Sequence, residues 1–423
     1  MASLTFVCLE TTEFFTRELA RVAAVERDQL LLVTAGPPPL EGFPSLVTDA
    51  RADPAGTAAA IRARCAEAPV AAVLTEREVF LETAAELTEL LGVAGNPPEV
   101  VRAARDKARM KEIWSAAGVR TPAGRSFRSR AELAPETLTY PVVVKPARGF
   151  ASCGVRRVDS PAELLEQTKK IALINATLVA RESDQDAGLL VEECLDGEEY
   201  SVDTVWFDGE PVCEFLLSRG HPGLLAGPYY PDRLYLLQQS LPEERRREVS
   251  ALARDAVRAL GIRSGASHTE VRLRGGVPYV LESSARPGAG GVFYELVRRA
   301  HEVDFTRALY LSLVCSDRAE LDARLGLVRW RQVPEGASYF WYNLPYRGAG
   351  LIEEIAGAEE LERREDVLFC VWHKRPGGYL HAYNDLNPDY FCTVVGRHTA
   401  AQGGPPLEEL VASYDRLIDV GYR

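Results

Sequence analysis

The chain has 423 residues, more than one ordinary hydrophobic core accommodates, so two or three domains are expected. Apolar residues make up 46% and charged residues 26%, which is typical of a soluble globular protein, and no apolar run reaches the roughly 20 residues that span a bilayer. The net charge of −12 repels phosphate backbones, so nucleic acid and anionic membranes are poor partners, and a site for a polyanion must be locally basic.

The first residues, Met1–Glu18, mix acids into an apolar run and have no basic start. They therefore do not resemble a secretory signal, and we expect a cytoplasmic protein. Eight cysteines are scattered along the chain with no C-x-x-C pair, which argues against a metal site and against disulfides. We interpret them as reduced, small hydrophobic residues; a catalytic thiol is the alternative.

The first hundred residues alternate short apolar runs with helical patterns. This alternation predicts a small parallel sheet built from βαβ units. The expected strands are Leu4–Leu9, Gln29–Thr34 and Val70–Leu74, and the expected helices are Thr16–Ala24 and Thr57–Ala66. No G-x-G-x-x-G follows a strand, so this part is expected to serve as scaffold or substrate wall and not as a cofactor site.

A boundary is expected near Ala104, within the basic stretch that follows Asn96. Beyond it the pattern predicts a mixed α/β architecture, which divides the chain into three parts: 1–104, 105–310 and a carboxyl-terminal α+β part, 311–423. The expected later elements are strands at Leu189–Glu193, Tyr200–Trp206, Ser267–Arg274 and Val277–Ser283, and helices at Pro242–Leu260 and Pro406–Leu417.

Lys145 ends a buried apolar strand, and a small-residue loop from Gly149 through Ser152 to Gly154 follows it. Glycines let backbone N–H groups approach phosphate oxygens, and a lysine adds a point charge. The segment therefore suggests a phosphate site. The alternative is a lysine that snorkels beside an ordinary turn.

Glu270 and Glu282 lie on the two arms of a predicted hairpin that turns at Gly275-Gly276. Facing carboxylates repel each other unless a cation lies between them. Mg²⁺, which also binds ATP oxygens, is the cation expected there. A two-residue loop with regular pairing would put the glutamates on opposite faces. We therefore predict a three-residue loop that pairs Leu273 with Val277, or an equivalent bulge; two solvated glutamates are the alternative.

Two further side chains belong to this region. His268 lies two residues before Glu270 and should share its face of the strand. There it either orients substrate or is a core histidine whose ring nitrogens are hydrogen-bonded. Arg286 lies four residues beyond Glu282, a position suited to hold a carboxylate and the charge that develops when it is attacked. A surface ion pair is the alternative for Arg286.

The order of these segments resembles the ATP-grasp ligases, from about Val70 to Leu313, and most closely the carboxylate–amine ligases that make dipeptides and amides. The resemblance rests on Asp106-Lys107, Val144-Lys145-Pro146, Val191-Glu192-Glu193-Cys194-Leu195, Glu199–Asp203, His268-Thr269-Glu270 and Glu282-x-Ser284-x-Arg286. It implies an ATP-grasp fold with a Rossmann-like amino-terminal domain.

The resemblance also implies roles for individual residues. Lys107 and Lys145 would hold the ATP phosphates under the Gly149–Gly154 loop. Glu192 and the Leu195 backbone would hydrogen-bond to adenine, and Glu199 would hydrogen-bond to the ribose hydroxyls. Glu270, Glu282 and Ser284 would ligate Mg²⁺ or Mn²⁺, and Arg286 would bind the substrate carboxylate. The family usually has Asn where this chain has Ser284, so one of two expected metal ions would be bound more loosely.

The chemistry so implied joins small-molecule carboxylate and amine substrates. A carboxylate attacks the γ-phosphate to give an acyl phosphate and ADP, and an amine then displaces phosphate. Water must be excluded, and we expect Arg148–Cys153 to form the lid. The small residues Gly288–Gly291 are expected to leave space beside Arg286, and Tyr229, Tyr230 and Tyr235 to line the same pocket, whereas Tyr339–Tyr342 is expected in the core.

Three other functions stay open. They are a carboxylase or purine-type ligase, a small-molecule kinase of the same fold, and a non-catalytic ATP-binding protein. The non-catalytic alternative is disfavoured by five charged residues that occur together: Lys107, Lys145, Glu270, Glu282 and Arg286. Charged side chains that are costly to hold close together tend to be lost from sites that no longer catalyse a reaction. A homodimer is expected from the resemblance alone.

Overall fold

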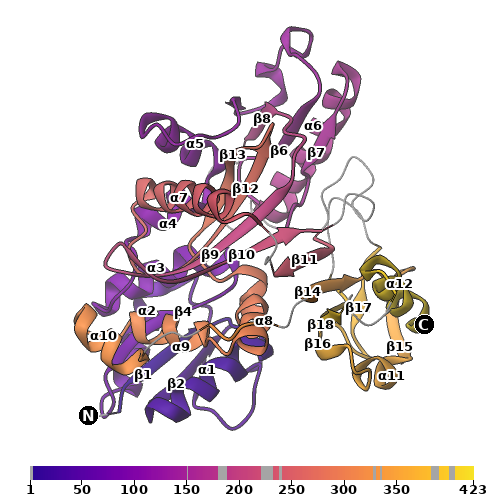
Figure 1. The fold of residues 1–423 in the computed structure, drawn as a ribbon. Helices are drawn as coiled ribbons and strands as arrows, with labels where there is room; N and C mark the ends of the chain where they lie inside the picture. Colours follow the sequence, from indigo (N-terminus) through magenta and orange to yellow (C-terminus); the bar gives the residue numbers. More distant parts are fainter. Residues whose placement is uncertain are drawn as a thin grey trace.

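The computed structural model describes residues 3–149, 151–179, 188–220, 232–237, 241–326, 330–333, 336–382, 390–399 and 405–423. The predicted pocket residues Tyr229 and Tyr230, and Phe150 of the predicted lid, lie outside these ranges. Within them, the chain forms a mixed α/β molecule, as predicted, and its strands form four sheets (Figure 1). None of the described helices is both long and apolar enough to cross a membrane.

The amino-terminal sheet is parallel, with strand order β3-β2-β1-β4, which confirms the predicted βαβ rhythm. Its central strands are near-continuous apolar runs, the pattern expected when helices cover both faces. The strands are β1 (Thr5–Leu9), β2 (Gln29–Thr34), β3 (Ser45–Val47) and β4 (Val70–Leu74); the helices are α1 (Glu13–Glu26), α2 (Pro54–Arg64) and α3 (Leu81–Leu91). Loops after the carboxyl ends of β1 and β4 reach the site described below.

Two short helices, α4 (Pro98–Arg105) and α5 (Lys107–Ala116), connect this sheet to the rest. Asp106 separates them, because its extended backbone ends α4 while its carboxylate accepts the Ala108 and Arg109 N–H groups and so caps α5. The cap places Lys107 at the first position of α5, buried beside the predicted loop. The expected boundary near Ala104 falls in the last turn of α4.

A small antiparallel sheet, β5-β8-β6-β7, stands above the large sheet (Figure 1). It consists of β5 (Gly124–Phe127), β6 (Val142–Pro146), β7 (Arg156–Val158) and β8 (Leu189–Glu193), covered by α6 (Pro161–Ile174) and a turn of π-helix, Asn175–Val179. Single 3₁₀ turns at Arg130–Glu132 and Pro135–Thr137 lead into β6. Lys145 and Glu192 come from neighbouring strands of this sheet.

The large sheet has eight strands in the order β13-β12-β9-β10-β11-β14-β18-β16, so its last three strands come from the carboxyl-terminal part. The strands are β9 (Glu199–Phe207), β10 (Glu210–Arg219), β11 (Leu234–Leu237), β12 (Gly265–Arg274), β13 (Val277–Ser284), β14 (Ala337–Leu344), β16 (Val367–Trp372) and β18 (Cys392–Thr399). Helix α7 (Glu243–Leu260) packs on β12 and β13 and ends at Gly261, whose φ of 84° closes its last turn.

The hairpin β12–β13 decides where the predicted acidic pair lies. Arg274 pairs with Val277 across Gly275-Gly276, whose φ angles of 55° and 81° fit a type I′ turn, so the predicted three-residue loop is wrong. The predicted alternative, a bulge, is confirmed: the register shifts between Glu270 and Val271, and Glu270 pairs directly with Glu282. The bulge returns both glutamates to one face.

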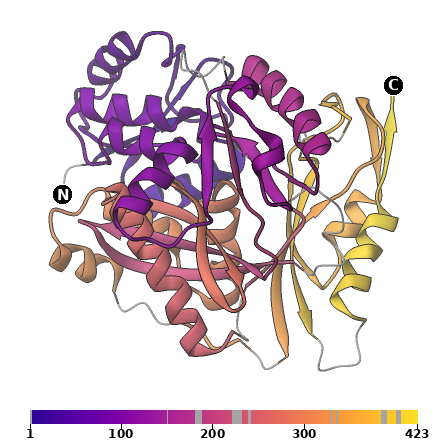
Figure 2. The ribbon, with the colours of Figure 1, turned by 90° about the horizontal axis from the view of Figure 1, so that it is seen from above.

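Helices α8 (Val292–His301), α9 (Phe305–Ser312) and α10 (Arg318–Leu325) join the large sheet to the amino-terminal part (Figure 2). The Phe6 and Tyr310 rings stack with centroids 3.6 Å apart, and Arg21 pairs with Asp304 at 2.7 Å. The chain from Val292 to Leu325 therefore packs on the first sheet, and the predicted limit after residue 310 falls inside α9. The three-part division stays a prediction.

The remaining carboxyl-terminal elements pack beside β14 and β18 and form a second core there. They are β15 (Gly350–Ala356), α11 (Ala358–Glu362), β17 (Tyr379–Leu380), α12 (Leu407–Leu417) and β19 (Asp419–Tyr422), with a third sheet in the order β17-β15-β19. The run Tyr339–Tyr342 is buried, as predicted. All eight cysteines are free, also as predicted.

Candidate active site

Two hollows meet at the hairpin. The first, which we call the inter-sheet cleft, lies between the small and the large sheet. The second, which we call the lower cavity, has a volume of about 380 Å³ and lies between the hairpin, the amino-terminal loops and the carboxyl-terminal strands. Five of the predicted residues line both: Lys107, Gly149, Ser152, Glu270 and Glu282. A group held in the cleft can therefore meet a group held in the cavity at these residues.

Two lysines surround one glutamate beside the cleft, and of the three, Lys145 and Glu192 line it. The Lys145 ammonium lies 2.6 Å from the Glu192 carboxylate, and the Lys111 ammonium pairs with the other carboxylate oxygen. Burial alone would raise the pKa of Glu192, but the two ammonium groups hold it below its ordinary value. Lys111 was missed by the sequence reasoning, although it follows Lys107 by one helical turn of α5, a spacing that puts both on one face.

The pKa values of the two lysines of this cluster are shifted in opposite directions. Burial lowers the pKa of Lys111 to about 8, which Glu192 only partly offsets. The pKa of Lys145 is raised, because the charges of Glu192 and Glu282 outweigh its burial. Lys145 is thus a firmly charged group between the cleft and the acidic pair, as a phosphate ligand needs to be.

The predicted phosphate loop borders both hollows. Lys107 donates to the Gly149 carbonyl at 3.2 Å, while Gly149 and Ser152 line the cleft and the cavity. Gly154 serves packing: its φ is 73°, and a β-carbon there would lie 2.6 Å from the Ile174 side chain. Arg148 is buried and pairs with Glu82 at 2.5 Å.

The far end of the cleft holds Leu195 and Glu199. Glu199 is buried between two guanidinium groups, with Arg219 at 2.5 Å and Arg272 at 3.3 Å. Arg219 also pairs with Asp232 at 2.9 Å. These contacts lock the Glu199 side chain in one orientation, so that its position in the cleft is set before any ligand binds.

The acidic pair has a marked charge asymmetry. Burial and the facing carboxylate of Glu282 raise the pKa of Glu270. Burial would also raise the pKa of Glu282, but Lys107, whose ammonium is 3.1 Å away, and Lys145 lower it to about 2. Two carboxylates held together at the meeting point of the two hollows are a site at which a cation is favoured.

The donor set fits a metal ion that shares its ligands with a nucleotide. The described residues hold no cluster of three or more His, Cys, Asp or Glu side chains arranged around a metal. Mg²⁺ is commonly held by one or two carboxylates with the remaining positions taken by phosphate oxygens and water. Glu270 and Glu282 supply that smaller set, so the residues suit Mg²⁺ or Mn²⁺ bound together with ATP.

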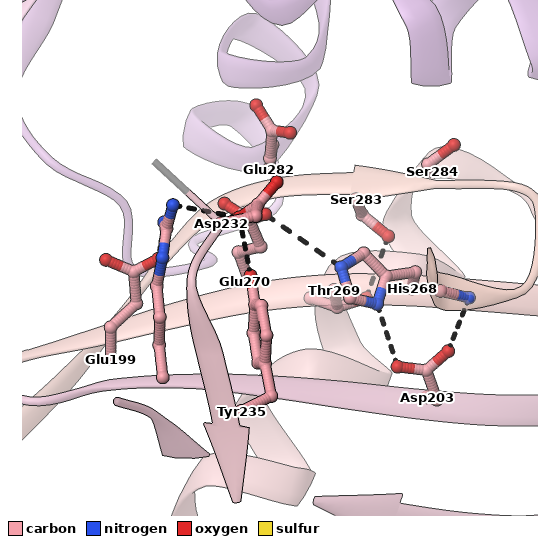
Figure 3. Close-up of polar contacts among 12 residues, drawn as sticks. Glu199, Asp203, Asp232, Tyr235, His268, Thr269, Glu270, Glu282, Ser283 and Ser284 are labelled. Atoms are coloured by element: carbon pink, nitrogen blue, oxygen red, sulfur yellow. Dashed lines mark hydrogen bonds and ion pairs between the residues drawn. The ribbon is translucent and has the colours of Figure 1, made fainter. Parts of the chain in front are cut away.

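His268 lies between two carboxylates (Figure 3). Its Nδ1 is 2.7 Å from Asp203, and its Nε2 is 3.9 Å from Glu270. Burial works against the charged imidazolium, but these carboxylates raise the pKa of His268 to about 10. Asp203 also accepts the Gly288 N–H at 2.8 Å, and it had not been selected from the sequence as a separate site residue. The geometry fits a positioned cation in the lower cavity more than a plain core histidine.

Arg286 and Ser284 meet at a carboxylate from the amino-terminal sheet. Glu78, in the 3₁₀ turn Glu78–Phe80 after β4, accepts from the Arg286 Nε and from the Ser284 hydroxyl, each at 2.6 Å. Arg105 lies 3.6 Å from the same carboxylate. The sequence reasoning missed Glu78, although loops after the carboxyl ends of parallel strands are usual site positions. Arg286 also lines the lower cavity.

The small residues after Arg286 do not all leave space. A β-carbon on Gly288 would lie 2.6 Å from His268, and one on Gly291 would lie 2.6 Å from the Phe15 ring, so these two positions are filled by close packing. Only Ala289 and Gly290, in the 3₁₀ turn Gly288–Gly291, line the lower cavity. The expectation of open space along all of Gly288–Gly291 is therefore wrong for two of the four residues.

Replacing Gly290 with tryptophan is expected to reduce the size of the carboxylate that the lower cavity can accept, because the indole enters this cavity. The φ of 62° at Gly290 adds strain of about 1–2 kcal/mol, which Gly290→Ala shares without filling the space. Hydroxamate formation over a series of carboxylates of increasing size measures the effect. An unchanged size range in the tryptophan variant would show that Gly290 does not border the carboxylate.

Glu76, directly after β4, is a buried carboxylate in the wall of the lower cavity. Its Oε1 accepts the Thr12 N–H at 2.6 Å, while its Oε2 has no hydrogen-bond partner among the described residues. Burial raises the pKa of Glu76 to about 7, and the Thr12 hydrogen bond offsets this only in part. The group thus carries a proton more firmly in the folded than in the unfolded chain.

This shift predicts a stability difference that depends on pH. Because the folded pKa is raised, the contribution of Glu76 is most favourable below its ordinary pKa of 4.5 and is lost as pH rises through about 7. At pH 8 we expect Glu76→Gln to be more stable than the wild type, relative to their difference at pH 4.5, by up to about 3 kcal/mol. Urea unfolding of both proteins at the two pH values measures this; a pH-independent difference would contradict it.

The lower cavity also has an aromatic wall. Tyr235 on β11, Phe293 on α8 and Trp341 on β14 pack together with ring centroids 5.1 to 5.8 Å apart, and all three line the cavity. Trp341 packs edge to face with the other two rings, which are tilted relative to each other. Of the predicted pocket tyrosines, the structure thus places Tyr235 in the wall. Trp341 belongs both to the hydrophobic core and to the wall of the lower cavity, because it is 4% exposed and still borders the cavity.

Comparisons with known proteins agree with this arrangement. Residues 138–294 match the model of the ATP-grasp domain. A D-alanine–D-alanine ligase of Marinomonas sp. (strain MWYL1) is 33% identical over 48% of this chain and 62% of its own length. That of Paracidovorax citrulli (strain AAC00-1) is 31% identical over 57% of this chain and 71% of its own.

The chain spans 62% and 64% of the length of the first two such relatives. The solved structure of an L-amino acid ligase from Bacillus licheniformis has the same fold over the whole of both chains, with a TM-score of 0.83 at 24% identity. The domain match, the identity to these relatives and the two sheets on either side of the inter-sheet cleft lead to one conclusion: this chain belongs to the ATP-grasp family.

Proposed function

We propose that the protein is an ATP-dependent carboxylate–amine ligase, which forms an amide or peptide bond through an acyl phosphate and takes an amino acid as one substrate. The observation that carries the proposal is the meeting of the two hollows at Lys107, Glu270 and Glu282. A nucleotide in the cleft and a carboxylate in the cavity would react there. The names of the relatives, which are D-alanine–D-alanine ligases and an alanine–anticapsin ligase, support the same chemistry.

In this proposal the nucleotide lies in the inter-sheet cleft. Glu192 and the Leu195 backbone face adenine, Glu199 faces the ribose, and Lys107 and Lys145 hold the phosphates under the Gly149–Gly154 loop. Glu192 would then exchange part of its pairing with Lys111 and Lys145 for the adenine amino group. Lys111 would keep the local charge balanced. The Lys145 ammonium group can turn to the phosphates, while the Lys111 ammonium group stays paired with Glu192.

Glu270 and Glu282 would hold Mg²⁺ or Mn²⁺, with Ser284 as a weaker ligand whose hydroxyl proton goes to Glu78. The metal, when bound, supplies neutralisation of the charge on the transferring phosphoryl group. Lys107 and Lys145 add positive charge from the protein side, and Arg286 orients the attacking carboxylate. Positioning of this kind can lower a barrier by roughly 7–11 kcal/mol without a protein nucleophile.

The proposed reaction balances in two steps. A carboxylate oxygen attacks the γ-phosphorus, the bond to the β-γ bridging oxygen breaks, and ADP leaves. The amine nitrogen then attacks the acyl carbon, phosphate leaves and the nitrogen loses a proton. His268, charged and held by Asp203, is positioned to stabilise the oxyanion of the second step. A homodimer stays part of the proposal on family resemblance.

The test is product analysis with Mg·ATP, a pool of amino acids and hydroxylamine as the trapping amine. ADP and phosphate release that depends on one carboxylate, together with hydroxamate formation, is the expected result. AMP and pyrophosphate would indicate adenylation and contradict the proposal. A phosphorylated acceptor without hydroxamate would indicate a kinase of the same fold.

A further inference from the structure

Five charged side chains of alternating sign connect the predicted phosphate loop to the carboxylate site. Arg148, directly before the loop, lies 2.5 Å from Glu82. The same Glu82 carboxylate lies 3.1 Å from Arg105. Arg105 lies 3.6 Å from Glu78, which in turn pairs with Arg286 at 2.6 Å. We call these five residues the charge chain; each of its two carboxylates is shared by two guanidinium groups.

The two carboxylates of the charge chain come from one short stretch and hold a buried cation between them. Glu78 and Glu82 are four residues apart, in the 3₁₀ turn and in the first turn of α3, a spacing that puts both carboxylates on one side. Arg105 is the last residue of α4, where a cation is favoured, and its side chain is 4% exposed. A guanidinium buried to this extent needs anionic partners, so Arg105 is held by both of the carboxylates that flank it.

The two contacts of Arg105 are unequal. Its guanidinium is closer to Glu82, at 3.1 Å, than to Glu78, at 3.6 Å, so the contact with Glu78 is the weaker one. With Arg148 on Glu82, two buried cations share that carboxylate, and Arg105 can also neutralise Glu78. Without Arg148, Glu82 would attract Arg105 more strongly, since Arg102, which is 4.0 Å away and half exposed, is a weak substitute. The position of Arg148 therefore decides how much of the Arg105 charge is available to Glu78.

Glu78 in turn decides how freely Arg286 can bind a substrate. Burial would raise the pKa of Glu78, but Arg286 and Arg105 together hold it below its ordinary value, so its negative charge is shared between them. A substrate carboxylate must compete with Glu78 for the Arg286 guanidinium. That competition is weaker while Arg105 neutralises Glu78. It is stronger when Arg105 is attracted away, because Glu78 then holds Arg286 more tightly.

The other end of the charge chain lies where a nucleotide would be covered. Gly149, the residue after Arg148, lines both hollows, and its carbonyl accepts from the Lys107 ammonium at 3.2 Å. Lys107 is also one of the groups proposed to hold the ATP phosphates. Contacts between a nucleotide and this part of the loop therefore act on the backbone that carries Arg148.

We propose that a nucleotide bound under the loop keeps Arg148 on Glu82, and that the charge chain thereby frees Arg286 to bind the substrate carboxylate. Glu82 and Arg105 are then positioning residues, which touch neither substrate and act through Glu78. This inference rests on the nucleotide and carboxylate sites of the proposed function and deepens it, because it makes nucleotide binding strengthen carboxylate binding. Linkage requires the carboxylate to strengthen nucleotide binding by the same factor.

The test measures how much a nucleotide strengthens the binding of a carboxylate. Isothermal titration calorimetry gives the Kd of an amino acid for the whole chain, without nucleotide and with saturating Mg·AMP-PNP, a nucleotide that does not turn over. The probe is the amino acid of the product-analysis pool that binds most tightly when Mg·AMP-PNP is present. We expect the Kd of the wild type to fall by about 10-fold or more when the nucleotide is bound.

Two variants that interrupt the charge chain have opposite expected effects. Glu82→Gln keeps the size of a side chain that lines neither hollow and removes the charge that attracts Arg105 away from Glu78. Without nucleotide, its Kd should already lie within about 3-fold of the wild-type value with nucleotide. Arg148→Gln should do the reverse: once saturated with Mg·AMP-PNP, it should keep a Kd within about 3-fold of the nucleotide-free wild type.

The double variant Arg148→Gln/Glu82→Gln should behave like Glu82→Gln, because Arg148 acts through that carboxylate. A purely structural defect would instead weaken binding in every variant, and most in the double one. Glu86→Gln, at an exposed position of the same helix, is the matched control and should keep the wild-type coupling. Weaker carboxylate binding in Glu82→Gln, or a double variant that follows Arg148→Gln, overturns the proposal.

Binding and turnover together separate this inference from the proposed function. A wild-type protein that forms hydroxamates but binds the amino acid equally well with and without Mg·AMP-PNP keeps the ligase function and overturns the role of the charge chain. Coupled binding without hydroxamate formation from any carboxylate keeps the coupling and overturns the ligase function. A wild-type protein that binds no amino acid, with or without nucleotide, overturns both, since Arg286 then holds no carboxylate.

Discussion

Replacing Glu282 with glutamine is expected to lower the rate of carboxylate-dependent ADP release by about 10³-fold, which corresponds to about 4 kcal/mol in the activation free energy. The amide keeps the size of the side chain and its place opposite Glu270, but it removes the carboxylate that Lys107 and Lys145 keep ionised. The cation at the meeting point of the two hollows then has one charged ligand left, and it binds more weakly where the phosphoryl group is transferred.

The measurement is steady-state ADP release over a titration of Mg²⁺, and separately of Mn²⁺. The variant should need a higher metal concentration and should not regain the wild-type rate at saturation. Glu214→Gln is the matched control, because Glu214 is a glutamate of the same large sheet that pairs with Arg254 and lines neither hollow. A Glu282→Gln protein with more than a tenth of the wild-type rate would remove Glu282 from the proposed metal site.

Replacing Arg286 with alanine is expected to leave nucleotide binding unchanged within about 3-fold and to lower kcat/KM for the carboxylate by roughly 10²–10³-fold. Arg286 lines the lower cavity, whereas the groups proposed to hold the nucleotide lie in the inter-sheet cleft. The loss should therefore appear in carboxylate activation and not in the affinity for ATP.

This variant also disturbs packing, since Arg286 is the 2.6 Å partner of the partly buried Glu78. The double variant Arg286→Ala/Glu78→Gln removes the carboxylate that has lost Arg286 as its partner, and it should regain part of the lost stability without regaining activity. Arg254→Ala is the control, because Arg254 makes a two-pronged pair with Glu214 away from both hollows. Full turnover by Arg286→Ala would show that another group holds the carboxylate.

The hairpin shows where reasoning from residue patterns succeeded and where it stopped. The pattern predicted that Glu270 and Glu282 must share a face, and that either a longer loop or a bulge would bring this about. The choice between the two depended on the backbone: the pair of glycines adopts the tight turn, and the shift occurs beside Glu270 itself. A bulge leaves no residue-type signature comparable to that of a turn.

The residues that were missed have one feature in common. Glu76, Glu78 and Lys111 act through contacts with residues far away in the sequence: Glu76 with Thr12, Glu78 with Arg286 and Lys111 with Glu192. Single charged residues of this kind are ordinary in any sequence, and a solvated surface position is the usual interpretation. Only their burial distinguishes them, and burial results from the packing of the whole chain.

The sequence by itself determined the elements and their chemistry: the parallel amino-terminal strands, the Lys145 strand and its loop, and the glutamate-bearing hairpin. These follow from local periodicity, turn residues and the spacing of charges, which act over a few residues. Only the tertiary structure decided that Lys107, Gly149 and Glu282 meet between two hollows, and that the loop after β4 supplies carboxylates to a cavity formed largely by other segments. The physical reason is that such proximity arises from packing elements that lie far apart in the chain, and no local pattern records it.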